Sequence, residues 1–171
     1  MMMKQTSYLL LMTLWLFLTC NTAPQPEQQS LAIPIRDFDG WEHLFHLDTD
    51  STYVINFWAT WCKPCVEELP YFEQLGQAYS NQKVKVILIS LDFPQQIEKK
   101  LVPFIRKNNV RSEVWVLDDA DANTWIDKVS PQWSGAIPAT LVYNRNTREF
   151  REQTFDTYEE LNAIVEPLLK K

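Results

Sequence analysis

Two cysteines separated by two residues, Cys62 and Cys65, are the residues of this chain best suited to chemistry. They follow an apolar run, residues 53–58, whose β-branched and aromatic side chains predict a buried strand. A helix-like segment comes next, and Pro64 suits its first turn because no intrahelical N–H bond is lost there. Free N–H groups and the positive end of the helix dipole stabilise a thiolate at such a position. The pattern therefore predicts a redox site.

The remaining periodic segments predict the elements that would hold this site. A helix follows Cys65, with a kink expected at Pro70, and a kink or early break is expected at Pro103. Strands alternate with helices, and an Asn-Arg-Asn-Thr turn at 144–147 indicates a closing hairpin. The predicted strands are 31–36, 53–58, 84–91, 114–117, 139–143 and 148–155, and the other predicted helices are 94–108, 122–129 and 158–169. This order predicts an α/β three-layer sandwich.

Composition limits the classes of protein to which the chain can belong. Its 171 residues suffice for one domain with appendages, and 46% apolar and 22% charged residues are typical of globular proteins. A net charge of −6 without a basic cluster argues against nucleic acid as a partner. Three cysteines, two of them in one C-x-x-C motif, do not make a disulfide-stapled scaffold.

The first 23 residues have the pattern of a secretory signal. Lys4 is the only charge before a short apolar run at 8–18, which is about half the roughly 20 residues that a membrane-spanning helix needs. Cys20 at the end of this run predicts a lipoprotein signal, although the residues just before it depart from the usual small ones. Cleavage near Ala23 and an uncleaved anchor are the alternatives. All three place the protein outside the cytoplasm, in the periplasm or cell envelope, with membrane association through the N-terminus expected.

Residues 24–30 form a polar, proline-containing linker, and 31–171 form the predicted domain. Its motifs resemble those of the TlpA/ResA-like thiol–disulfide oxidoreductases of the bacterial cell envelope, which belong to the thioredoxin superfamily. The match spans roughly residues 31–170 and is carried by 56–59, Trp61-Cys62, Pro64-Cys65, Glu68, Pro70 and 135–140. The resemblance implies a thioredoxin-like three-layer sandwich with a central mixed β-sheet. One departure from thioredoxin is Asn56, which replaces a buried Asp and excludes proton transfer by a carboxylate at that position.

The resemblance also implies roles for the residues of the motif. Cys62 is expected to be the exposed nucleophile, its pKa lowered by the helix start, and Cys65 the resolving thiol. Lys63 would favour the thiolate slightly, and Trp61 would shield one side of the disulfide. Glu68 would tune the site or relay protons, and a plain acid in the first helical turn is the alternative. No cofactor beyond the redox-active disulfide is expected.

The second motif contains Ile137 and Pro138, and the resemblance implies a cis bond before Pro138. The loop would lie against the disulfide, with backbone groups of Ile137 binding an extended substrate chain. Expected partners are protein thiol or disulfide substrates and a membrane electron donor. Proteins of this kind reduce disulfides, and cytochrome c maturation is the best known use. The residues between the two cysteines do not settle the direction of electron flow.

The C-x-x-C motif has four other possible explanations. A thioredoxin-fold copper metallochaperone would use His43 or His46 as a third ligand, but a helix turn explains both histidines more simply. A structural zinc site lacks its two further ligands. A peroxidase would place a lone cysteine after a threonine-proline turn, a pattern that this sequence lacks. A binding module with a merely structural disulfide is the last alternative.

Overall fold

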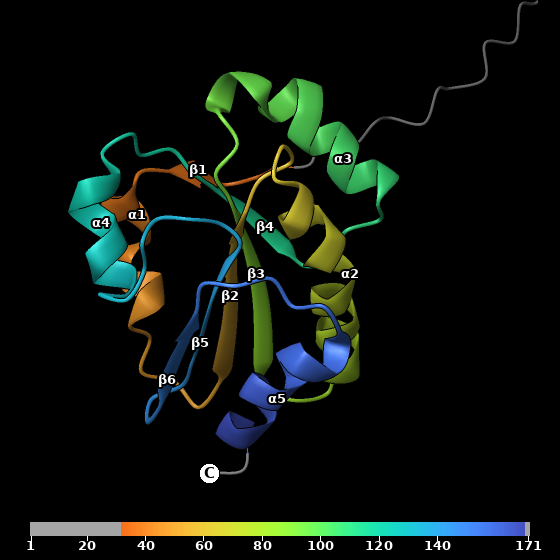
Figure 1. Cartoon of the computed structure of the whole chain (residues 1–171), viewed down its shortest axis with the longest axis vertical. Coiled ribbons are helices and arrows are strands. Elements are labelled where there is room, and N and C mark those ends of the chain that lie inside the picture. The colour runs from red at the N-terminus through yellow and green to blue at the C-terminus, as the bar shows by residue number, and fades with distance from the viewer. Residues whose placement is uncertain (1–31, 170–171) are drawn as a thin grey trace, which may run out of the picture. The chain divides into compact units, whose positions relative to one another are not determined.

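A mixed six-stranded sheet organises the chain, in the order β1-β4-β3-β2-β5-β6 (Figure 1). The computed structural model describes residues 32–169; the predicted signal, Cys20 and the linker lie outside these residues. The strands are β1 Ile35–Arg36, β2 Thr52–Trp58, β3 Val84–Ser90, β4 Glu113–Leu117, β5 Ala139–Tyr143 and β6 Arg148–Arg151. The strands β1, β4, β3 and β2 are parallel, whereas β5 and β6 run antiparallel to their neighbours. The predicted α/β sandwich with a mixed sheet is confirmed.

Helices cover both faces of the sheet, as the period-two alternation of β2 requires. Val54 and Trp58 face the helices of one layer, and Ile55 and Phe57 face those of the other. The first layer contains α2 Lys63–Ala78, α3 Val102–Lys107 and α5 Tyr158–Leu169; the second contains α1 Phe38–Trp41, the 3₁₀ helix η1 Glu42–Phe45 and α4 Ala122–Val129 (Figure 1). Within residues 32–169, no helix has the length and apolarity needed to cross a membrane.

The predicted helix 94–108 stays helical but changes type just before Pro103, where a kink or an early break was expected. The segment is a 3₁₀ turn η2 (Pro94–Gln96), a π turn η3 (Ile97–Leu101) and then α3. The N–H of Val102 donates to the carbonyl of Ile97, five residues back, and Pro103 itself has no N–H to give. Pro70, by contrast, lies inside α2, which continues to Ala78.

The predicted strand 148–155 is too long. Strand β6 ends at Arg151, and the chain then leaves the sheet. The reason lies on the helical side: the backbone N–H of Phe155 donates to the Glu68 side chain in α2 at 2.9 Å. An N–H committed to a side chain in another layer cannot extend the strand ladder.

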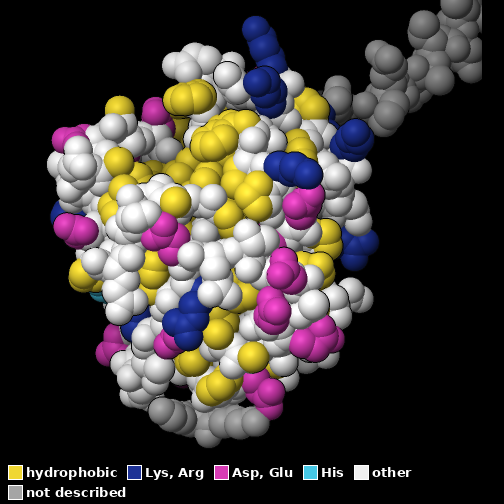
Figure 2. Space-filling view, viewed as in Figure 1, with side chains coloured by type: hydrophobic (Ala, Val, Ile, Leu, Met, Phe, Trp, Pro, Cys, Tyr) yellow, Lys and Arg dark blue, Asp and Glu magenta, His cyan; other side chains and the backbone are white. Residues whose placement is uncertain are grey.

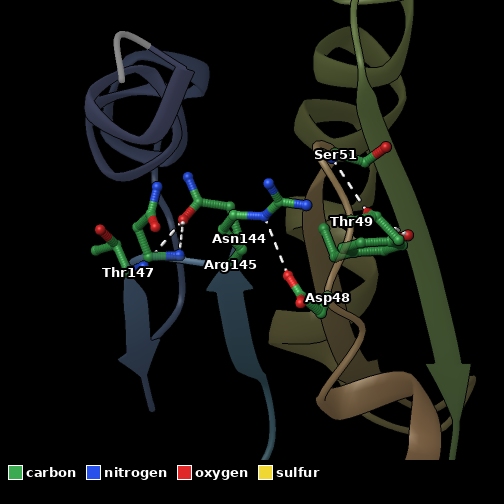
Figure 3. A network of polar contacts seen from close by, with 8 residues as sticks. Asp48, Thr49, Ser51, Asn144, Arg145 and Thr147 are labelled. Carbon is green, nitrogen blue, oxygen red and sulfur yellow. Dashed lines mark hydrogen bonds and ion pairs between the residues drawn. The ribbon is translucent and has the colours of Figure 1, made fainter.

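The β5–β6 turn is tied to the segment that leads into β2 (Figure 3). The Asn144 side chain accepts hydrogen bonds from the N–H groups of Asn146 and Thr147, each at 2.9 Å, which forms the predicted hairpin turn. Figure 3 shows Arg145 reaching from this turn to Asp48, with Nε 3.0 Å from the carboxylate oxygen. This network lies at the end of β2 opposite the cysteines, because Tyr53 pairs with Tyr143 there.

Replacing each of two glycines by alanine should change the stability of the protein in opposite directions. Gly135 has φ +94° and a Cβ there would lie 2.9 Å from Ile126, so Gly135→Ala should destabilise the protein by about 1 kcal/mol or more. Gly76 is helical, and its nearest neighbour, Val86, would lie 3.7 Å from a Cβ, so Gly76→Ala should stabilise by roughly 0.5–1 kcal/mol. Urea unfolding of both variants and the parent measures the two changes. Equal midpoints for the two variants would contradict this prediction.

Candidate active site

Strand β2 leads into α2 (Figure 1). The two cysteines lie at this junction, and they form a disulfide. Cys62 is the N-cap residue of α2, with an extended backbone, and Cys65 lies in the first turn. The N–H of Cys65 points at the sulfur of Cys62 across 3.3 Å. Pro64 also occupies the first turn, where it removes no helical hydrogen bond. A thiolate on Cys62 would thus face a backbone donor and the positive end of a helix of 16 residues.

Cys62 is less exposed than its predicted role implies. Its exposed fraction is 6%, and that of Cys65 is 0%. The carbonyl oxygen of Ile137 lies 3.7 Å from the Cys62 sulfur and covers it in part. In the disulfide the Cys62 sulfur carries no hydrogen, so this contact is not a hydrogen bond. A reduced Cys62 thiol could donate a hydrogen bond to the same carbonyl. The expectation of an exposed nucleophile is therefore corrected: Cys62 is the more accessible cysteine of a largely buried pair.

The loop that covers Cys62 contains a cis peptide bond between Ile137 and Pro138, as predicted. Trp133 anchors this loop, because its indole N–H donates a hydrogen bond to the Ala136 carbonyl at 2.7 Å. The Trp133 ring also packs on Phe57 of β2, with ring centroids 4.5 Å apart. Trp133 was not predicted as a site residue, since a lone tryptophan in a loop carries no periodic signal.

Lys63 and Trp61 both lie on the surface. The Lys63 ammonium pairs with Glu67 of the next turn at 3.4 Å, and its side chain is almost fully exposed. A charge so well solvated affects a nearby thiolate little, in line with the small effect expected. Trp61 is 56% exposed, whereas Trp58, three residues earlier, is fully buried. Whether Trp61 shields the disulfide stays a prediction.

Glu68 is a fully buried carboxyl group at the junction of three elements. It lies beyond the first turn of α2, so the alternative of a first-turn acid is wrong. Its Oε1 accepts from Nδ2 of Asn56 in β2 at 2.9 Å, and its Oε2 accepts from the N–H of Phe155 at 2.9 Å. The Asn56 amide also donates to Thr140 of β5 at 3.1 Å. The acidic group missing from position 56 is thus supplied from the adjacent helix.

Burial raises the pKa of Glu68 to about 7, because the charged form loses hydration in the core. The hydrogen bonds from Phe155 and Asn56 act in the opposite direction and offset only part of the shift. Glu68 therefore exchanges its proton near neutral pH, while ordinary glutamates are ionised there. This property suits a residue that passes protons to or from the cysteines.

Asp92 is a second buried carboxylate that the sequence analysis missed. It lies two residues after the end of β3 and is 1% exposed. Its carboxylate accepts hydrogen bonds from the Thr60 N–H at 2.9 Å and the Thr60 hydroxyl at 2.5 Å. The Ser90 hydroxyl also donates to Asp92, at 2.9 Å. We call these contacts the Thr60–Asp92 clasp. It fixes the loop that precedes Cys62 to the end of the neighbouring strand.

The two histidines lie away from the cysteines. His43 belongs to η1 and His46 caps it, and both are exposed. The same segment accepts hydrogen bonds at Leu44 from Tyr143, at the end of β5 opposite the site. Within residues 32–169, no three His, Cys, Asp or Glu side chains are grouped so that they could hold a metal ion. Neither histidine therefore lies near the cysteines as a third metal ligand would have to.

The raised pKa of Glu68 predicts a pH dependence of stability. Between the ordinary pKa of 4.5 and about 7, the unfolded chain releases this proton and the folded protein keeps it. Stability should therefore fall by about 3 kcal/mol as pH rises through this window, and level off above it. Urea unfolding of the oxidised protein from pH 4 to 8 measures this loss. In Glu68→Gln the loss should disappear, and parallel curves for the two proteins would contradict the assignment.

Comparison with known proteins places this site in a family. The sequence profile of the AhpC/TSA family matches residues 40–148. The thiol–disulfide oxidoreductase ResA of Geobacillus thermodenitrificans is 32% identical over 84 residues, which is 48% of each chain. The chain thus spans about half the length of this curated relative. The sporulation thiol–disulfide oxidoreductase A of Bacillus subtilis is 27% identical over 122 residues, covering 69% of this chain and 73% of that one.

Solved structures support the fold. A secreted disulfide oxidoreductase of Mycobacterium tuberculosis superposes with a TM-score of 0.53 at 24% identity, covering 69% of this chain and 82% of that one. A thioredoxin-family thiol:disulfide interchange protein of Chlorobium tepidum gives 0.57 at 18%, covering 70% and 80%. These likenesses concern the fold, while the profile match covers more than half of the chain. The motif resemblance to ResA-like proteins is confirmed, and the chain belongs to the thioredoxin-like AhpC/TSA family.

Proposed function

We propose that this protein is a thiol–disulfide oxidoreductase that reduces protein disulfides through Cys62 and Cys65. One observation carries the proposal: the Cys62 sulfur lies at the N-cap of α2, 3.3 Å from the Cys65 N–H, and is bonded to Cys65. A helix start lowers the pKa of such a thiol, and a second thiol one turn away can resolve a mixed disulfide. ResA and the sporulation oxidoreductase, which carry this activity in their names, are relatives of the chain.

The reaction proceeds through two thiol–disulfide exchanges. The Cys62 thiolate attacks one sulfur of the substrate disulfide, and the other sulfur leaves as a thiolate that takes up a proton. The Cys65 thiolate then attacks the Cys62 sulfur, which forms the Cys62–Cys65 disulfide and releases the second substrate thiol. Two electrons pass from the protein to its substrate. A dithiol electron donor at the membrane restores the reduced pair by the reverse exchanges.

Two further groups assist these steps. Glu68 lies three residues after Cys65 in α2, so both side chains lie on one face of the helix. With a pKa of about 7, Glu68 accepts or returns the proton of Cys65 near neutral pH. The Ile137 carbonyl beside the Cys62 sulfur offers an acceptor to the backbone N–H of an extended substrate chain. Substrates would then include the haem-attachment cysteines of apocytochromes c, the use that the sequence resemblance implies.

The assignment of the two thiols can be tested by trapping. Cys65→Ser should accumulate a mixed disulfide between Cys62 and a substrate protein, because the resolving thiol is gone. Cys62→Ser, the matched control, should trap none, since Cys65 is fully buried. Non-reducing gels of acid-quenched cells, followed by mass spectrometry of the linked peptides, identify the sulfur that is used. Mixed disulfides on Cys65 rather than Cys62 would reverse the assignment.

We also propose that the protein works outside the cytoplasm and is anchored by lipid at Cys20. The signal-like residues 1–23 and the linker 24–30 support this placement. Cys20→Ser should lose incorporation of a labelled fatty acid and move from the membrane to the soluble extracytoplasmic fraction. Thr22→Ala, two residues away, should keep both label and location. If the parent protein takes up no label, cleavage near Ala23 or an uncleaved anchor replaces lipidation.

A further inference from the structure

Among the described residues, three large apolar side chains are highly exposed: Ile35 at 46%, Trp61 at 56% and Phe93 at 60%. Ile35 lies in β1, at the edge of the sheet. Trp61, in contrast, is the chain neighbour of Cys62, and Phe93 follows the clasp residue Asp92. Covering an exposed aromatic ring with a partner lowers the free energy of the complex. Two such rings beside a reactive disulfide are therefore candidates for substrate recognition.

The register of the sheet brings Trp61 and Phe93 to the same part of the surface. Strands β2 and β3 pair in parallel with a constant offset, which ends at Trp58 opposite Ser90. The chains continue in this register beyond the strands, since Thr60 binds Asp92 through two hydrogen bonds. The next pair at the same offset is Trp61 and Phe93. The clasp therefore places the two aromatic residues on neighbouring segments at the end of β2 that leads to the cysteines.

The clasp also keeps this surface apolar. Asp92 is the nearest acid in the chain to Phe93, but its carboxylate is buried and accepts hydrogen bonds from Thr60 and Ser90. Figure 2 shows hydrophobic side chains gathered over the upper part of the molecule, where α2 begins, with Lys and Arg side chains at their border. The charge at the site thus lies at the rim, as with the exposed Lys63, and not beside the rings.

Cys62 then has a different surface on each side. The Ile137 carbonyl, 3.7 Å from its sulfur, offers a backbone acceptor on one side. The segment with Trp61 and Phe93 offers aromatic rings without a hydrogen-bonding group from Asp92 on the other. Because β3 and β5 flank β2 on opposite sides, a polypeptide that exchanges with Cys62 can place residues next to its own cysteine over this segment.

We propose that Phe93, together with Trp61, selects substrates that carry a large apolar side chain next to the reacting cysteine. The proposal rests on the thiol–disulfide exchange proposed above and adds a preference that the exchange itself does not require. The occupant is a segment of the substrate polypeptide. Phe93 and Trp61 act on binding, so the preference belongs to kcat/KM for polypeptides.

The test compares three disulfides with the full-length reduced protein. Two are glutathione mixed disulfides of peptides that differ only in the residues flanking cysteine, which are phenylalanine in one and serine in the other. The third, 2-hydroxyethyl disulfide, normalises any change in Cys62 reactivity. The parent protein should prefer the phenylalanine peptide by about tenfold in kcat/KM. Phe93→Ala should reduce this preference to about twofold, and Phe93→Leu should keep most of it.

Ile35→Ala is the matched control, because Ile35 is an exposed apolar residue three strands from β2. Its preference should equal that of the parent. An unchanged tenfold preference in Phe93→Ala overturns the proposal, as does a parent that reduces all three disulfides without preference; both outcomes leave the exchange reaction intact. If none of the three disulfides is reduced, the proposed function fails first, and the preference falls with it. A parent dimer that Phe93→Ala dissociates would show that a second copy covers the rings, which also overturns the proposal.

Discussion

The complete burial of β2 is the constraint on which the rest of this structure depends. All seven residues from Thr52 to Trp58 are buried, so the strand needs a partner strand on each side and a helical layer on each face. Both layers are present, and β3 and β5 supply the two ladders. A short turn joins this strand to the cysteines, and the Thr60–Asp92 clasp fixes that turn to the neighbouring strand. A redox pair held in this way keeps its geometry while substrates come and go.

Polar groups inside this core are few, and they connect elements. Glu68 links α2 to β2 through Asn56, and to the start of the C-terminal region through Phe155. Asp92 links the end of β3 to the loop before Cys62. Each carboxyl group costs hydration free energy when buried, and each recovers part of this cost by accepting several hydrogen bonds. The two acids thus fix the turn before Cys62 and the helix that contains Cys65 to the rest of the fold.

The sequence was sufficient for those features that depend on neighbouring residues. The strand before Cys62, the helix start with Pro64 and the cis bond before Pro138 belong to short motifs. Contacts between distant segments were not predictable, since no local pattern marks Phe155 as a donor to Glu68, 87 positions away. The end of β6 was misplaced for that reason. The buried state of Cys62 was missed similarly, because the covering carbonyl comes from another loop 75 residues on.

The disulfide joins residues only three positions apart in the sequence. A cross-link restricts the unfolded chain by an amount that grows with the logarithm of the loop it closes, so this one restricts it far less than a long-range bridge would. In the thermodynamic cycle that connects folding with oxidation, chain entropy then contributes little. The difference in stability between the oxidised and reduced proteins is set instead by the contacts that each form makes inside the fold. A measured difference in stability between the two oxidation states would therefore report on those contacts and not on the length of the closed loop.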